Sequence, residues 1–204
     1  MSKLKMEDVR KEQVIRAATS CIIEKGLSNL SMKAIAAEAD VSAGVIYHYF
    51  ENKEDVLLQV LKESFRQSHE LVVEKVEPLQ TAAEKLTKHI ENINTVPRDN
   101  TEFYAVLLNY LGEAKHNPEI RNIIAKFFNN LKSYTNQYVA DLSLEEKRKK
   151  NLAVITYALG LGLGIMWTID DQLYDIEEMD QSLNDLFSTF IGNGRGDSHD
   201  DSDR

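Results

Sequence analysis

The segment VSAGVIYHYFENKEDVLLQV, residues 41–60, gathers several groups that can bind an anionic surface. Side chains of the YHY triplet at 47–49 can donate hydrogen bonds to phosphates or to base edges. Lys53 stands at the expected start of a helix, where free backbone N–H groups and a positive charge both favour a phosphate. Gly44 lowers helix propensity by about 1 kcal/mol relative to alanine, which makes sense if the backbone must approach a partner closely. These residue types indicate a surface that binds nucleic acid.

No residue pattern supports catalysis. The five histidines lack the mutual spacing of metal ligands: His48, His69, His89, His116 and His199. No phosphate-binding glycine loop and no GxSxG motif follows a strand pattern, and the glycines at 160–164 fall inside an expected helix. The neighbouring acids Asp170 and Asp171 are typical of a solvated helix end. We therefore expect a protein that is not an enzyme and that has no metal and no cofactor.

Composition fits a soluble globular chain with an uneven charge. The 204 residues are 43% hydrophobic and carry a net charge of −9. Residues 1–50 hold seven basic and six acidic side chains, so the negative charge lies in the remainder and does not exclude DNA. The single Cys21 excludes an intramolecular disulfide and indicates a reducing compartment. With no apolar signal segment in MSKLKMEDVRKEQ, we expect a cytoplasmic protein.

The elements that position the 41–60 segment are short helices. A first helix ends at Gly26, and Ser31 is the expected N-cap of a second helix at 32–39. Ser42 is the expected N-cap of a third helix that ends near Tyr49, and Asn52 that of a long fourth helix. Two short helices joined by a tight turn form a helix-turn-helix unit. Its predicted core consists of Ile35, Val41, Ile46, Phe50, Ile15, Ile22 and Leu57.

The rest of the chain is also predicted to be helical. Capping boxes mark three helix starts, at Thr81 with Glu84, Ser143 with Glu146 and Asp175 with Glu178. Pro118 starts another helix, and a further one is expected at 101–115. We expect nine helices, no strand and an all-α fold. Residues 192–204 are rich in Gly, Asp and Ser and are predicted to be a disordered acidic tail.

The stretch LSMKAIAAEADVSAGVIYHYFENKEDVL resembles the DNA-binding signature of TetR-family transcriptional regulators. The matching positions are Ser31 in place of Thr, then Ile35, Ala36, Ala39, Val41, Ser42, Gly44, Tyr47, Tyr49, Phe50, Lys53, Glu54 and Leu57. By this resemblance, the residues that meet the DNA backbone are Ser31, Lys33, Tyr47, Tyr49 and Lys53. Those that face bases are Ala43, Val45 and His48, and Ser42 and Gly44 complete the site.

Two positions depart from the family signature. Asp40 replaces the glycine preferred in the turn, and we expect a strained but intact turn because Asp tolerates left-handed geometry. Val45 replaces a common Thr and could contact a thymine methyl group.

The resemblance also implies a helical ligand-binding and dimerisation domain at 54–191, after a DNA-binding domain at 1–53. The implied partners are a palindromic double-stranded DNA operator, a second copy of the chain, and a small apolar or amphipathic effector. Candidate ligand-binding residues are Tyr104, Leu108, Phe127, Leu131, Tyr134 and Trp167.

A second hypothesis arises from residues 152–169, LAVITYALGLGLGIMWTI, which are 18 residues without a charge. This length is at the lower limit for a membrane-spanning helix, and Gly160 and Gly164 form a GxxxG pair. Against insertion stand the polar Thr156 and Thr168 and three glycines, and an apolar helix can equally be buried in a soluble core.

The leading hypothesis is a ligand-responsive DNA-binding regulator that acts as a repressor and does not associate with a membrane. The alternative is a membrane-tethered helical protein.

Overall fold

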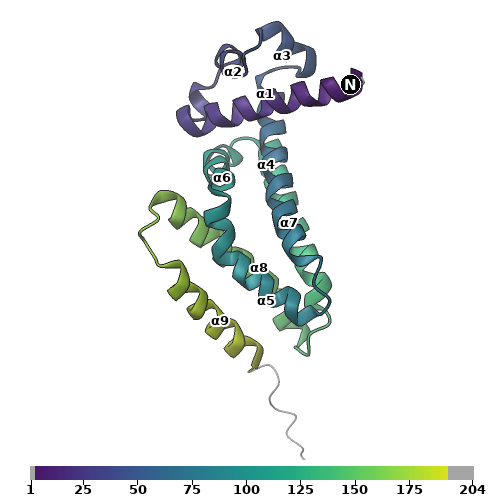
Figure 1. The fold of residues 1–204 in the computed structure, drawn as a ribbon, viewed down its shortest axis with the longest axis vertical. Helices are drawn as coiled ribbons and strands as arrows, with labels where there is room; N and C mark the ends of the chain where they lie inside the picture. The colour runs from purple at the N-terminus through teal and green to yellow at the C-terminus, as the bar shows by residue number, and fades with distance from the viewer. Residues whose placement is uncertain (1–2, 193–204) are drawn as a thin grey trace, which may run out of the picture. The chain divides into compact units, whose positions relative to one another are not determined.

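The computed structural model describes residues 3–192, and in this range it is all-helical, with no strand. The elements are α1 (Lys3–Lys25), the 3-10 helix η1 (Leu27–Asn29), α2 (Met32–Glu38), α3 (Ala43–Tyr49), α4 (Lys53–Val76), α5 (Ala82–Asp99), α6 (Thr101–Ala114), α7 (Pro118–Val139), α8 (Glu146–Ile169) and α9 (Ile176–Gly192). This confirms the all-α prediction (Figure 1). The predicted tail lies outside the described residues, apart from Gly192 at the end of α9.

The chain divides into two compact units. The first contains the residues through Leu71 together with Asn100–Phe128, and the second contains Val72–Asp99 and the residues from Asn129 onward. The first unit therefore includes more of the chain than the predicted DNA-binding domain at 1–53.

A Schellman motif forms the turn between α2 and α3. The Val41 N–H donates to the Ala36 carbonyl at 3.0 Å, and the Asp40 N–H donates to the Ala37 carbonyl at 3.3 Å. Asp40 has φ of 51° and is the one non-glycine residue with positive φ in the described range. The Gln13 side-chain amide of α1 donates to the Ala39 carbonyl at 2.7 Å. The left-handed turn expected at Asp40 is therefore present, and α1 holds it in place.

The core under the helix-turn-helix differs in part from the predicted one. Ile22, Ile35, Ile46 and Phe50 are buried as expected, and so is Cys21, where burial raises the pKa of the thiol. Ile15, Val41 and Leu57, however, are only partly buried. Their places are taken by Val14, Ala18, Val56 and Val60, which are fully buried. The difference is local, because Val14 in α1 and Val56 in α4 are buried where their neighbours Ile15 and Leu57 were predicted to be.

Aromatic residues fill the remainder of the first unit. The rings of Phe65 in α4 and Phe127 in α7 stack with centroids 4.0 Å apart, and Phe103 of α6 packs against both. The buried Tyr110 hydroxyl donates to the Leu57 carbonyl at 2.7 Å and so joins α6 to α4. Burial raises the pKa of Tyr110, which keeps this hydroxyl a donor.

Most of the predicted helix starts are confirmed by their caps. The Ser31 hydroxyl accepts from the Ala34 N–H at 3.1 Å, and the Asn52 side chain accepts from the Asp55 N–H at 2.9 Å. Thr81 and Glu84 form a reciprocal capping box, whose hydrogen bonds lower the pKa of Glu84. At α9, the Asp175 carboxylate accepts from the Glu178 N–H at 2.9 Å.

Two predicted caps are wrong. Ser42 occupies the N-cap position of α3, but its side chain makes no capping hydrogen bond. Ser143 lies outside α8, which begins after Glu145. A short turn in which the Leu144 N–H donates to the Leu142 carbonyl at 2.9 Å delays this helix start by two residues.

In the second unit, α5 packs against both α8 and α9 (Figure 1). Gly160 of α8 faces the Ile93 backbone, and a Cβ added to Gly160 would lie 3.8 Å from the Ile93 Cα. The Asn94 side-chain amide donates to the Ile176 carbonyl and to the Asp180 carboxylate, at 2.6 and 2.9 Å. A core that includes Leu86, Ile90, Leu152, Leu163, Leu183 and Phe187 fills the space between these helices.

Candidate functional site

One edge of α3 is exposed and makes few contacts within the chain. Tyr47 is 56% exposed, and Ser42, Gly44 and His48 are also exposed. On the opposite edge Ile46 is buried. Fixing that residue to the core leaves the Tyr47 and His48 side chains directed outward, which is the arrangement that binding in a major groove requires.

The half-buried residues of α3 flank this exposed edge. Ala43, Val45 and Tyr49 are each partly accessible. The rings of His48 and Tyr49 meet edge to face, with centroids 4.9 Å apart, which limits the orientations open to His48. Contact of these three residues with bases or backbone stays a prediction.

Gly44 is not required by the fold of α3. Its φ is not positive, and a Cβ added to it would meet only the Ser42 Oγ, at 3.7 Å, which is ordinary van der Waals contact. Alanine would therefore fit here and would favour the helix. Contacts within the chain therefore give no reason for the absence of a side chain at position 44.

The residues predicted to meet the DNA backbone come from three elements. Ser31 and Lys33 lie at the start of α2 and are exposed, and Lys53 is the first residue of α4 and is partly exposed. The Ser31 oxygen accepts the capping bond, which leaves its hydroxyl hydrogen available to donate to a phosphate. Lys53 follows the Asn52 cap, so its ammonium group accompanies the free N–H groups of a helix start.

The predicted ligand-binding residues fall in both units. In the first unit, Tyr104 and Phe127 both contact Phe103, while Leu108 is exposed. In the second unit, Leu131 is buried, Tyr134 is partly buried and Trp167 packs against Tyr174. A shared role of these residues in ligand binding stays a prediction.

A buried polar cluster in the second unit was missed by sequence reasoning. His89 and Asn92 of α5 are 4% and 5% exposed, and Thr135 of α7 is fully buried. The Thr135 Oγ1 lies 3.5 Å from the His89 Nε2, and the Tyr157 hydroxyl of α8 contacts Thr135 and the Leu131 carbonyl. Burial lowers the pKa of His89 to about 4, so its ring is neutral at physiological pH. The available signal was a histidine and an asparagine on the apolar face of α5.

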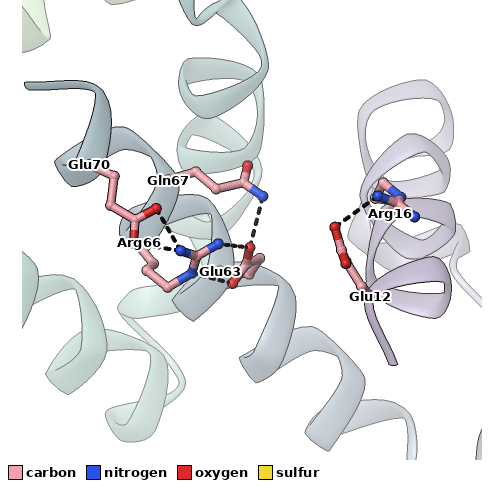
Figure 2. Close-up of polar contacts among 6 residues, drawn as sticks. All are labelled: Glu12, Arg16, Glu63, Arg66, Gln67 and Glu70. Atoms are coloured by element: carbon pink, nitrogen blue, oxygen red, sulfur yellow. Dashed lines mark hydrogen bonds and ion pairs between the residues drawn. The ribbon is translucent and has the colours of Figure 1, made fainter. Parts of the chain in front are cut away.

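A polar cleft of about 240 Å³ lies within the first unit, lined by Glu12, Ile15, Arg16, Thr19, Ser20, Glu63, Ser64, Gln67 and Glu102. Figure 2 shows that two of its three acids already have basic partners. Arg16 bonds Glu12 at 2.8 Å, and Arg66 bonds Glu63 and Glu70. Hydrogen bonding from Arg66 lowers the pKa of Glu63. Two of the three acidic side chains in the cleft are therefore already neutralised by ion pairs within the chain.

One face of α8 is apolar and exposed. Val154, Met166 and Ile169 are 51%, 40% and 70% exposed, and Ala158 and Gly162 lie between them on the same face. By length and composition α8 is the one helix in the described range that could cross a membrane. An uncharged face of this kind is suited to another apolar surface, whether a protein or a lipid.

Together, an all-helical fold and an N-terminal helix-turn-helix with an outward-facing second helix define a DNA-binding protein of the helix-turn-helix class. Residues 14–60 match the family described as bacterial regulatory proteins, tetR family. This match, together with the similar proteins described next, indicates a TetR-family transcriptional regulator.

Similar proteins extend this likeness over most of the chain. The fatty acid metabolism regulator protein of Bacillus subtilis (strain 168) is 29% identical over 190 residues, covering 89% of this chain and 95% of that protein. A transcriptional regulator from Pseudomonas aeruginosa PAO1 has the same fold, with a TM-score of 0.79, 17% identity and 91% of each chain covered. The regulator FadR from Bacillus subtilis, solved in complex with stearoyl-CoA, is 25% identical with a TM-score of 0.64, covering 86% of this chain and 96% of that one.

Proposed function

We propose that this chain is a cytoplasmic repressor that binds a palindromic DNA operator as a homodimer and leaves it when a small effector binds. The observation that carries the proposal is the exposed edge of α3, where Tyr47 and His48 point outward beside a glycine that the fold does not need. A surface of this size and polarity fits the major groove of B-form DNA.

The proposed reading of DNA requires two copies of α3. In helix-turn-helix dimers, two recognition helices enter successive major grooves, about 34–36 Å apart or a multiple of that distance. His48, with Ala43 and Val45, would face bases, while Ser31, Lys33, Tyr47, Tyr49 and Lys53 would hold the backbone. Effector binding would favour a dimer geometry with the wrong spacing, so that release follows from the difference in effector affinity between two conformations.

The proposed dimer interface is the apolar face of α8 together with α9. Val154, Gly162, Met166 and Ile169 give α8 an uncharged surface with small residues near its centre, and Leu186 of α9 is 51% exposed. Burial of this face against a second copy removes apolar area from water, at about 25 cal/mol per Å². Insertion of the same face into lipid is the alternative, and likeness to a family of DNA-binding regulators favours the dimer.

The proposed effector is a long-chain acyl compound. This rests on the whole-length likeness to a fatty acid metabolism regulator and on the structural likeness to a FadR solved with stearoyl-CoA. It also agrees with an interior in which none of the buried polar residues in the described range is an acid or a base other than neutral His89.

The DNA-binding part is tested by selecting bound duplexes from random DNA and by titrating the selected site at several salt concentrations. Lys53→Ala should weaken binding to all sequences and flatten the salt dependence, because one phosphate contact is lost in each half-site. His48→Ala should instead change the base preference. Failure to select any palindromic motif, or a Lys53→Ala protein with wild-type affinity and salt slope, would count against the proposal.

The membrane alternative is tested by fractionation. A tethered protein would sediment with membranes and require detergent, whereas the proposed regulator remains in the supernatant and elutes as a dimer.

A further inference from the structure

The inward face of α5 carries a hydrogen-bond donor that the described residues leave unused. Asn92 is 5% exposed, and its Nδ2 has no hydrogen-bond acceptor among the described side chains and backbone. Burial of an amide donor without an acceptor costs about 1–3 kcal/mol. A leucine of similar volume would avoid this loss, so the asparagine needs a reason other than stability of the chain alone.

Asn94, two residues further along the same helix, shows what a structural asparagine looks like here. Its Nδ2 donates both to the Ile176 carbonyl and to the Asp180 carboxylate, and it joins α5 to α9. Both asparagines are buried, and each leaves one side-chain atom without a partner, but in Asn94 that atom is the acceptor Oδ1, whereas in Asn92 it is the donor Nδ2. The contrast sets Asn92 apart from ordinary core packing.

A polar cluster around His89 lies one helical turn from Asn92 on α5. His89 is one helical turn away and therefore shares a face with Asn92. Thr135 of α7 lies 3.5 Å from the His89 Nε2, and the Tyr157 ring of α8 meets the His89 ring edge to face at 5.5 Å. Leu131, one of the predicted ligand-binding residues, supplies the carbonyl that the Tyr157 hydroxyl bonds. Three helices thus bring neutral polar groups together in the interior of the second unit.

We propose that the Asn92 amide donates a hydrogen bond to the carbonyl oxygen of the effector, at a site whose polar wall is formed by His89, Thr135 and Tyr157. This assignment rests on the proposed acyl effector and identifies its carbonyl group as the part that Asn92 binds. A neutral carbonyl fits because it accepts a hydrogen bond without bringing a charge. A ligand with a free carboxylate is disfavoured, because no lysine or arginine belongs to the buried residues in the described range and the negative charge would have no cation beside it. A cationic ligand is disfavoured because the positively polarised amide hydrogens of Asn92 would face it.

The test compares two ligands that differ only at the carbonyl. Stearoyl-CoA and its thioether analogue S-octadecyl-CoA, in which a methylene replaces the carbonyl, are titrated calorimetrically into the full-length protein. Wild-type protein should bind the thioether about tenfold more weakly, the factor expected for one buried hydrogen bond. Asn92→Leu should bind the two ligands equally and should melt at a higher temperature without ligand. Thr156→Val is the matched control, because the buried Thr156 hydroxyl bonds the Leu152 carbonyl within α8, and this variant should keep the tenfold ratio.

The outcomes separate this assignment from the proposed function. If wild-type protein binds both ligands with equal affinity, the assignment to Asn92 is wrong, but the proposal of an acyl effector still stands. The same conclusion follows if the Asn92→Leu protein keeps the tenfold ratio. Wild-type protein that binds neither ligand but still binds its operator refutes the acyl effector, and with it the assignment. The wild-type ratio needs no variant, and Asn92→Ala replaces the leucine variant if the latter fails to fold.

Discussion

Replacing Gly44 with alanine should affect folding and DNA binding in opposite directions. Within the chain the new methyl group meets only the Ser42 Oγ at 3.7 Å, so it introduces no clash. Alanine in a helix is favoured over glycine by about 0.5–1 kcal/mol, and the position near the start of α3 places the gain toward the lower end. For a protein of this size the melting temperature should rise by about 1–3 °C.

The effect on DNA binding should be larger and of the opposite sign. If the α3 backbone at Gly44 lies against the DNA, a methyl group there forces the helix outward and lengthens the neighbouring hydrogen bonds. Loss of one good hydrogen bond in each half-site, at about 1 kcal/mol each, lowers operator affinity by at least tenfold. The assay is fluorescence anisotropy on the selected operator at fixed salt, since DNA affinities have meaning only at a stated salt concentration.

The matched control is Gly112→Ala in α6, where an added Cβ meets nothing within 4 Å. This variant should gain similar stability and keep wild-type operator affinity. If Gly44→Ala is more stable and also binds the operator as tightly as wild type, the idea that the backbone approaches DNA closely at this point is wrong.

Three further predictions concern other parts of the chain. Asp40→Gly should stabilise the protein by about 1 kcal/mol, because it relieves the left-handed conformation and removes a negative charge from the end of α2. Asp40→Ala should give no such stabilisation, since alanine also disfavours the left-handed conformation. Chemical denaturation of the two variants distinguishes their free energies of unfolding. Burial holds the pKa of His89 at about 4, below its ordinary 6.5, so the unfolded chain binds this proton first and stability is lost as the pH falls from 6.5 toward 4. The loss from this group amounts to at most about 3 kcal/mol, and His89→Gln should remove it in urea titrations compared pH by pH with wild type. Met166→Glu on the exposed face of α8 should yield monomers in analytical ultracentrifugation, whereas Leu111→Glu in α6, exposed to the same degree at 38% against 40%, should leave the dimer intact.

The helix-turn-helix was predictable from sequence because its signals are local. Ser31 and Asn52 cap the helices that follow them through residues three positions away. Asp40 takes the left-handed turn that its residue type tolerates, although Gln13 of α1 also supports this turn. The outward direction of Tyr47 and His48 followed from the burial of Ile46, which lies one and two positions before them.

The remaining features depend on contacts between residues that are distant in sequence, and patterns in a single sequence predict such contacts less well. Val14 and Val56 replace Ile15 and Leu57 in the core because the packing of α1 and α4 selects the inward stripe among several adjacent apolar residues. Ser143 looks like a cap, but a local turn at 142–144 moves the start of α8. The cluster around His89 and Asn92 involves residues of α7 and α8 that lie 46 or more positions away from His89, and periodicity alone carries no information on such contacts.

The bond from Gln13 to the Ala39 carbonyl has a consequence for how such a protein changes its target during evolution. Because this side chain fixes the carbonyl just before the left-handed residue, it helps to set the tilt at which the recognition helix leaves the turn. A substitution at Gln13 would change the orientation of α3, and with it the direction of every α3 side chain, without changing the sequence of α3. Operator preference can therefore drift through a residue that never touches a base, and two relatives with identical recognition helices need not regulate the same genes.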